Sequence, residues 1–123
     1  MSNYQTVEQI NKAIGAHGAW KMRLSVAINT GQFDTDARTA SCDDKCAFGQ
    51  WIHGSQIDAA TRSGMPYQVI RRLHADFHRS AGAVLSHALT GQKAEARSLL
   101  QGEYAERSEK LTRALNKWKR ELS

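Results

Sequence analysis

The chain has 123 residues, 41% of them hydrophobic and 24% charged, which predicts one soluble globular domain covering residues 1–123. Its 17 basic and 12 acidic side chains give a formal charge of +5, but they are interleaved. The densest basic pairs, Arg71-Arg72 and Lys119-Arg120, form no tract, so we expect no nucleic-acid partner. The polar N-terminus and the lack of a long apolar run predict a cytoplasmic protein without a membrane partner. Two cysteines are too few for a disulfide scaffold, and in a reducing compartment they are more often metal ligands or reactive thiols.

A long amphipathic helix is predicted over residues 6–30, ending at Gly31. Its apolar residues recur at the spacing of a bundle helix: Ile10, Ala13, Ile14, Trp20, Leu24, Ala27 and Ile28. His17 falls on the same stripe, at a place where leucine would be expected. Residues 32–46 are polar and predict a long loop, and a loop of this length in a compact domain is usually functional or held down by a specific bond.

A short apolar segment over residues 46–52 predicts one or two helical turns that stop at Gly54, and residues 57–62 predict a further turn. The second long helix starts at Pro66, ends at Gly91 and has the cleanest stripe, formed by Tyr67, Ile70, His74, Phe77, Ala81, Val84 and Ala88. The third long helix covers residues 92–122, with a stripe at Leu100, Tyr104, Ser108, Leu111, Leu115, Trp118 and Leu122. The predicted fold class is therefore all-α, an antiparallel bundle of long helices with a short helical segment after a long loop.

Three histidines have positions that favour a metal site. His74 and His78 are four residues apart, so their rings lie on one helix face, and H-x-x-x-H is a common two-ligand clamp. A buried histidine is by itself more often an ordinary core residue, but His17 on the stripe of another helix strengthens the metal hypothesis. Three histidines and one thiolate complete a closed tetrahedral zinc site, and a metal–sulfur bond at the end of the polar loop would hold that loop down.

Spacing alone does not decide which cysteine is the ligand. Cys42 and Cys46 are four residues apart, so a site with two cysteines and two histidines is also compatible, although the gap to His74 is too long for a zinc finger. Cys46 leads directly into the apolar residues Phe48 and Trp51, whereas Cys42 stands among serine and aspartate residues. We therefore expect Cys46 to be the ligand and Cys42 to be a bystander.

Three motifs, in this order, carry a family resemblance. They are H-G-A-W-K from His17, C-A-F-G-Q-W from Cys46 and H-A-D-F-H from His74. These motifs are similar to the patterns H-x-x-W-K/R, C-x-(L/F)-G-x-W and H-x-x-F-H of the chemoreceptor zinc-binding (CZB) family, and the similarity covers about residues 10–90. The first motif alone is a weak signal, but three motifs in order and with similar gaps are a strong one.

The resemblance implies a bacterial cytoplasmic sensory domain in which His17, Cys46, His74 and His78 bind one Zn²⁺. Members of the family are usually fused to chemoreceptors or diguanylate cyclases and are commonly homodimers. They sense zinc itself, or oxidants such as hypochlorous acid through the zinc-bound thiolate. This chain shows no signalling or cyclase segment, so the resemblance implies that it acts on such a protein in trans. The extra Cys42 offers an oxidised Cys46 a second thiol.

Other functions fit the sequence less well. A catalytic zinc keeps an open position and usually has a carboxylate base, whereas four protein ligands are available here without an H-E-x-x-H glutamate, so we expect no enzyme. A di-iron bundle needs carboxylates on its inward-facing stripes, and these stripes have none. The alternative function is a bundle that zinc only stabilises and that serves as an interaction scaffold.

Several residues near the candidate ligands are expected to have ordinary roles. Trp20 and Trp51 are expected to pack around the site as its hydrophobic shell. Gly49 is expected to allow two backbone segments to approach each other closely. His53 and Asp76 are expected at the surface.

Overall fold

The computed structural model describes residues 3–122, which form helices and connecting loops without any strand in that range. In chain order the elements are α1 (Asn3–Thr30), α2 (Ala37–Ala40), α3 (Ala47–Ile52), α4 (Ala59–Ser63), α5 (Met65–Leu89), α6 (Lys93–Leu99), the π-helical turn η1 (Leu100–Tyr104) and α7 (Ala105–Leu122). The predicted all-α helix bundle is therefore confirmed. Among the helices of this range, none is both long and apolar enough to cross a bilayer.

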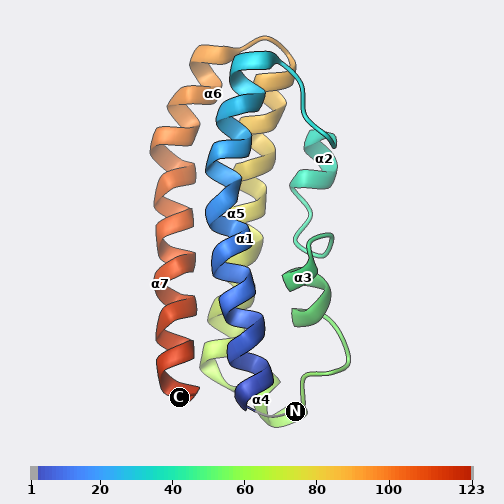
Figure 1. Ribbon diagram of the computed structural model, residues 1–123, viewed down its shortest axis with the longest axis vertical. Coiled ribbons are helices and arrows are strands. Elements are labelled where there is room, and N and C mark those ends of the chain that lie inside the picture. The colour runs from blue at the N-terminus through green and yellow to red at the C-terminus, as the bar shows by residue number, and fades with distance from the viewer. Residues whose placement is uncertain (1–2, 123) are drawn as a thin grey trace.

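Four segments of the chain run along the bundle, and one of them is irregular. α1 and α5 lie against each other and run in the same direction, and α6, η1 and α7 return along them as one continuous column (Figure 1). The segment with the short helices α2 and α3 descends on the side of the α1–α5 pair opposite to α7 (Figure 1). This segment takes the place of a fourth long helix. The four segments therefore alternate in direction along the chain.

The apolar stripes explain where the long helices lie and what they bury. Residues from the three predicted stripes form a continuous core in which the following side chains are almost inaccessible: Ile10, Leu24, Ile28, Ile70, Phe77, Ala81, Val84, Tyr104, Leu111 and Leu115. Two glycines in the left-handed region end long helices where the sequence predicts, Gly31 with φ of 72° and Gly91 with φ of 77°. Both turns reverse the chain at the same end of the bundle (Figure 1).

Two local features differ from the sequence-based expectation. The loop predicted over residues 32–46 contains α2, because the Asp36 carboxylate accepts a hydrogen bond from the Thr39 N–H at 2.7 Å and caps a short helix. Four residues are too few to show a helical period, so the pattern of apolar residues did not indicate this helix. The last long helix is predicted as regular, but it contains η1, since a single π turn changes hydrogen bonding without changing composition.

Segment 32–54 contacts the bundle by close packing at a few points. A Cβ atom at Gly82 of α5 would lie 2.5 Å from the Ser41 Cβ, so the end of α2 approaches α5 more closely than any other residue would allow. Near the start of the segment, the Phe33 ring stacks on Trp20 of α1 with centroids 5.8 Å apart. These contacts bring the middle of the segment over the faces of α1 and α5 that contain the predicted ligands.

Candidate metal centre

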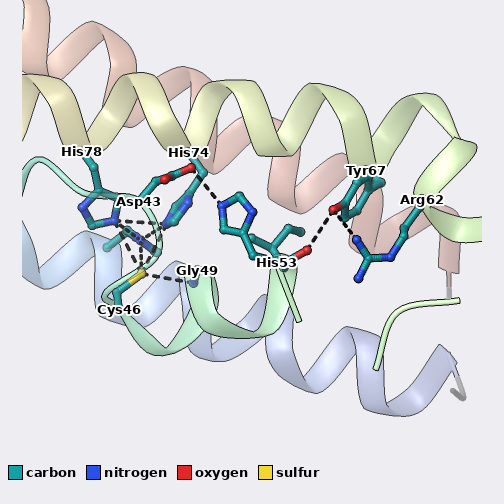
Figure 2. Close-up of polar contacts among 10 residues, drawn as sticks. Asp43, Cys46, Gly49, His53, Arg62, Tyr67, His74 and His78 are labelled. Atoms are coloured by element: carbon teal, nitrogen blue, oxygen red, sulfur yellow. Dashed lines mark hydrogen bonds and ion pairs between the residues drawn. The ribbon is translucent and has the colours of Figure 1, made fainter. Parts of the chain in front are cut away.

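Four side chains from three parts of the chain converge between α1, α5 and the start of α3. His17 comes from α1, His74 and His78 from α5, and Cys46 from the turn before α3, and their ligand atoms all lie within 4.8 Å of one another. The three Nε2 atoms are separated by 3.0 Å (His17–His74), 3.1 Å (His74–His78) and 3.3 Å (His17–His78). The Cys46 Sγ lies 3.4, 3.5 and 3.8 Å from the Nε2 atoms of His74, His78 and His17 (Figure 2).

These separations match those of four ligands around one ion. Tetrahedral zinc, with bonds of about 2.0–2.1 Å to nitrogen and about 2.3 Å to sulfur, has N–N edges of about 3.3 Å and N–S edges of about 3.6 Å. The observed N–N distances of 3.0–3.3 Å and S–N distances of 3.4–3.8 Å lie close to these edges. Imidazole nitrogen and sulfur are also the donor atoms that zinc prefers, so the cluster fits one such ion.

Backbone carbonyl groups orient two of the three imidazoles. The His17 Nδ1 lies 2.8 Å from the Ala13 oxygen, and the His78 Nδ1 lies 3.0 Å from the Ala40 oxygen. An Nδ1–H that donates to a carbonyl leaves the Nε2 lone pair free to face the cluster. The Nδ1 of His74 is buried without a hydrogen-bond partner in the described part of the chain. Because Ala40 belongs to α2, this short helix helps to position His78, one of the candidate ligands.

Burial keeps the three imidazoles uncharged. It lowers the pKa of His17 to about 4, although the hydrogen bond to Ala13 acts in the opposite direction. Burial also lowers the pKa of His74 to about 2, and repulsion from the neighbouring histidines adds to this effect. The pKa of His78 is lowered by the same cause. Since the neutral imidazole is the ligand form, the three rings need to release no proton at neutral pH when a metal binds.

Cys46 is both a candidate ligand and the residue that caps α3. Its Sγ accepts a hydrogen bond from the Gly49 N–H at 3.3 Å. Burial raises the pKa of the thiol, and the backbone N–H groups oppose that rise only in part, so a nearby cation is needed to hold the sulfur as a thiolate. A Cβ atom at Gly49 would lie 1.8 Å from the Asp43 carbonyl oxygen, which confirms the predicted close approach. The turn before α3 is folded tightly over the helix, and this fixes the position of the sulfur.

Comparison with known families agrees with this geometry. The family model of the chemoreceptor zinc-binding domain, CZB, matches residues 17–85, more than half of the chain. The chain belongs to the CZB family. The matched range begins at His17 and contains the three other members of the cluster, and the description of the CZB family names zinc as its metal. No curated protein and no solved structure matches the chain.

In this CZB domain the structure brings together all four residues that the sequence singles out as candidate ligands. Cys42 lies outside the cluster, and its Sγ donates to the Arg38 carbonyl oxygen at 3.3 Å, so the set with two cysteines and two histidines is not assembled. Asp76 also lies outside the cluster, in ion pairs with two arginines. His53 and Asp76 both differ from their expected place at the surface, because each is half-buried. The His53 Nε2 lies 3.1 Å from the Asp43 carboxylate.

Aromatic rings surround the CZB cluster, as expected, but not all of them are the predicted ones. Trp20 meets the His78 ring edge-on at a centroid distance of 5.9 Å, whereas Trp51 packs one layer further out, against Phe48. Phe77 lies 5.0 Å from the His17 ring, and Phe48 lies 5.1 Å from the His74 ring. The sequence did not indicate this role for the two phenylalanines, although both lie inside the family motifs. These rings exclude water from the ligand side of the imidazoles.

Proposed function

We propose that this CZB chain is a regulatory domain that holds one Zn²⁺ with His17, Cys46, His74 and His78 and has no catalytic activity of its own. The observation that carries the proposal is the convergence of three imidazole nitrogens and one sulfur within 4.8 Å, in a largely buried position. Four protein donors fill a tetrahedral ion and leave no position for a substrate. This favours a sensory role over a hydrolytic one.

Zinc content of the purified protein tests the ligand set. We expect about one zinc per chain for the wild type, and loss of most of it to a weak chelator in Cys46→Ser and His74→Ala, because three donors hold the ion less firmly than four. Cys42→Ser is the matched control, since it removes the other free thiol and leaves the cluster complete. Equal zinc loss from the two cysteine variants, or a wild-type protein that takes up no zinc, would contradict the proposal.

The same site senses oxidants through Cys46, which is half-buried and so within reach of a small molecule. When bound, zinc holds the sulfur as a thiolate at neutral pH. The thiolate attacks the chlorine of hypochlorous acid, and hydrolysis of the sulfenyl chloride gives sulfenic acid, so that sulfur loses two electrons and chlorine leaves as chloride. The oxidised Cys46 no longer anchors the start of α3, and segment 32–54 is released from α1 and α5.

Stoichiometric hypochlorous acid, peptide mapping and hydrogen exchange test this response. We expect Cys46 to be modified before Cys42, followed by zinc release and faster amide exchange over residues 32–54. Cys46→Ser should not respond, and Cys42→Ser should keep the first step. If Cys42 is oxidised first, or if exchange over residues 32–54 does not change, the scaffold function is the better explanation and the oxidant sensor is wrong.

We assign the domain to the cytoplasm, where it acts in trans on a chemoreceptor or a diguanylate cyclase; the family's description as a chemoreceptor domain supports this. A homodimer is supported by the outer face of α1, where Met22 is 74% and Val26 52% exposed, and where Gly15 and Gly18 have open space around them. Light scattering at micromolar concentration should give twice the mass of one chain, and the mass of a single chain would overturn the dimer.

A further inference from the structure

A groove of about 680 Å³ opens beside the metal centre, between α5 and the chain that runs from α3 to α4. Its walls contain three guanidinium groups and one imidazole, from Arg62, Arg71, Arg72 and His53, and one carboxylate, from Asp43. Figure 2 shows Asp43, His53 and Arg62 in a row along α5, next to the ligand cluster. The function proposed above uses none of these groups.

Within the lining of this basic groove three guanidinium groups outnumber one carboxylate. That carboxylate, from Asp43, lies 3.1 Å from the His53 Nε2 and contacts none of the three arginines. Arg71 and Arg72 form no hydrogen bond or ion pair with any residue of the described range. Asp76 stands one helical turn after Arg72, but its carboxylate pairs with two other arginines. Two guanidinium groups therefore keep their donors free at the edge of the groove.

The basic groove differs in this respect from the outer face of α7. There, Lys110 pairs with Glu106 at 3.7 Å and Arg113 with Glu109 at 3.6 Å, each one helical turn apart. Such pairs are what a solvated helix face usually shows. A concave surface whose basic side chains lack acidic partners of this kind concentrates anions from solution.

One wall of the basic groove is rigid. The Arg62 guanidinium donates to the Ile57 carbonyl at 3.1 Å, to the Tyr67 hydroxyl at 3.4 Å and to the Gly54 carbonyl. The Tyr67 hydroxyl in turn donates to the Ile52 carbonyl at 2.9 Å. These bonds fix the plane of the guanidinium and leave two of its five N–H groups for a ligand. A donor held in this way loses little side-chain entropy when it binds an anion.

We propose that the basic groove binds the phosphate group of a small phosphorylated molecule, independently of the metal. A phosphate monoester carries up to two negative charges and three acceptor oxygens, which suits guanidinium groups that approach from two helices. A volume of about 680 Å³ also exceeds what a phosphate ion needs, so the organic part of the molecule has room along α5. Arg71 and Arg72 supply the free donors, and Arg62 supplies the fixed one.

Titration of the zinc-loaded protein with adenosine 5′-monophosphate, inorganic phosphate and adenosine, followed by NMR chemical shifts at about 0.05 M salt, tests the proposal. We expect the nucleotide to bind, the free phosphate to bind more weakly and adenosine not to bind. Arg71→Gln and Arg72→Gln should each weaken nucleotide binding about tenfold, because each removes a charge-assisted hydrogen bond. Arg120→Gln, an equal charge change at an exposed position of α7, should change it less than about twofold.

Several results would overturn the basic groove as a phosphate site. These are an equal loss of affinity in Arg120→Gln, equal binding of adenosine, or shifts that lie outside the residues of the groove. An acidic peptide that binds more tightly than the nucleotide, with the same dependence on Arg71 and Arg72, would replace the phosphorylated molecule by a protein partner. Both arginines are exposed, so circular dichroism and thermal midpoints of the variants should match the wild type and show that a loss of binding is not a loss of fold.

Discussion

α7 and segment 32–54 lie on opposite sides of the α1–α5 pair (Figure 1) and meet where the ring centroids of Trp51 and Trp118 are 6.2 Å apart. Different interactions hold the two parts in place. α7 buries Leu111, Leu115 and Trp118, and its outer face has acidic and basic side chains paired one turn apart. Segment 32–54 has helices of only four and six residues, which are not stable on their own. It also buries Phe48 and Ile52, and its middle is placed by the tight turn at Gly49 and by the position of the Cys46 sulfur in the candidate cluster.

A chemical signal at the ligand cluster should act on segment 32–54 and leave α7 in place. Burial of an apolar stripe does not depend on a bound ion, so α7 should keep its place whether or not zinc is present. Segment 32–54 contributes one candidate ligand and one carbonyl partner of a candidate ligand, so its stability should follow the state of the cluster. Loss of metal or oxidation of Cys46 should therefore loosen segment 32–54 and leave α7 unchanged.

Removing one candidate ligand should have the largest effect on zinc affinity and on the stability of segment 32–54. Structural zinc sites contribute about 10–16 kcal/mol, so loss of one of four ligands in His74→Ala should cost about 3–4 kcal/mol, or roughly 10²- to 10³-fold in zinc affinity. Amide exchange should accelerate over segment 32–54 and stay slow in α7. Chelator competition and hydrogen exchange measure both, with His87→Ala on the same helix as the control. Equal loss of protection in α7 would contradict the expected difference between α7 and segment 32–54.

A cavity under α7 should lower the free energy of unfolding less than the loss of a ligand does. The decrease should be the same with and without zinc. Leu115 is fully buried, so Leu115→Ala should lower the free energy of unfolding by about 3 kcal/mol. Because the cavity lies under α7, the loss should be the same in zinc-loaded and zinc-free protein. Urea unfolding in the two states measures it. A difference of more than about 1 kcal/mol would show that α7 and the cluster are coupled.

The zinc-free protein should lose stability as the solution is acidified from pH 7 to pH 5. The pKa of His17 is about 4 in the folded chain and near 6.5 in the unfolded chain, so the unfolded chain binds more protons in this range. The free energy of unfolding should then fall with falling pH, by roughly 2 kcal/mol for this histidine at pH 5, and should not change above the unfolded value. Urea unfolding at several pH values tests this. A His17→Phe variant with an equally steep dependence would rule out His17 as a cause.

Two glycine substitutions should have small effects of opposite sign. Gly18 is an exposed helical residue with nothing within 4 Å of its missing Cβ, so Gly18→Ala should stabilise the protein by up to about 1 kcal/mol. Gly49→Ala should destabilise it by about 1–2 kcal/mol and weaken zinc binding, since its Cβ would collide with the Asp43 carbonyl oxygen. Thermal unfolding and chelator competition measure the pair. A stabilising Gly49→Ala would mean that the turn before α3 is not fixed as described.

The long helices and the histidines could be predicted because both follow from periodic burial. A helix that packs on one side repeats its apolar residues, and His17 and His74 stand on such stripes with exposed fractions of 3% and 0%. The motif around Cys46 could also be recognised, because the cysteine runs directly into buried aromatic residues. In the long helices the signal lies in side chains that recur at a fixed spacing, and at Cys46 it lies in the apolar residues that follow.

The remaining features depend on contacts that side-chain patterns do not record. The partner of His78 is a carbonyl group of α2, and every residue has a carbonyl group. The apolar residues after Cys46 favoured it over Cys42, but the path of the turn that aims its sulfur depends on backbone contact at Gly49. The pairing of His53 with Asp43 joins the two ends of α3 across ten positions, a spacing that no helical period explains because Asp43 precedes the helix.

Cys46 lies almost midway along the chain between the other ligands, 29 residues after His17 and 28 before His74. An ion held by the cluster therefore closes two loops of nearly equal length. The entropy of closing a loop grows only with the logarithm of its length, so ten additional residues in either loop would cost about 0.3 kcal/mol. Additional residues in the irregular connections of either loop should therefore cost little, whereas additional residues in the turn before α3 should displace the sulfur.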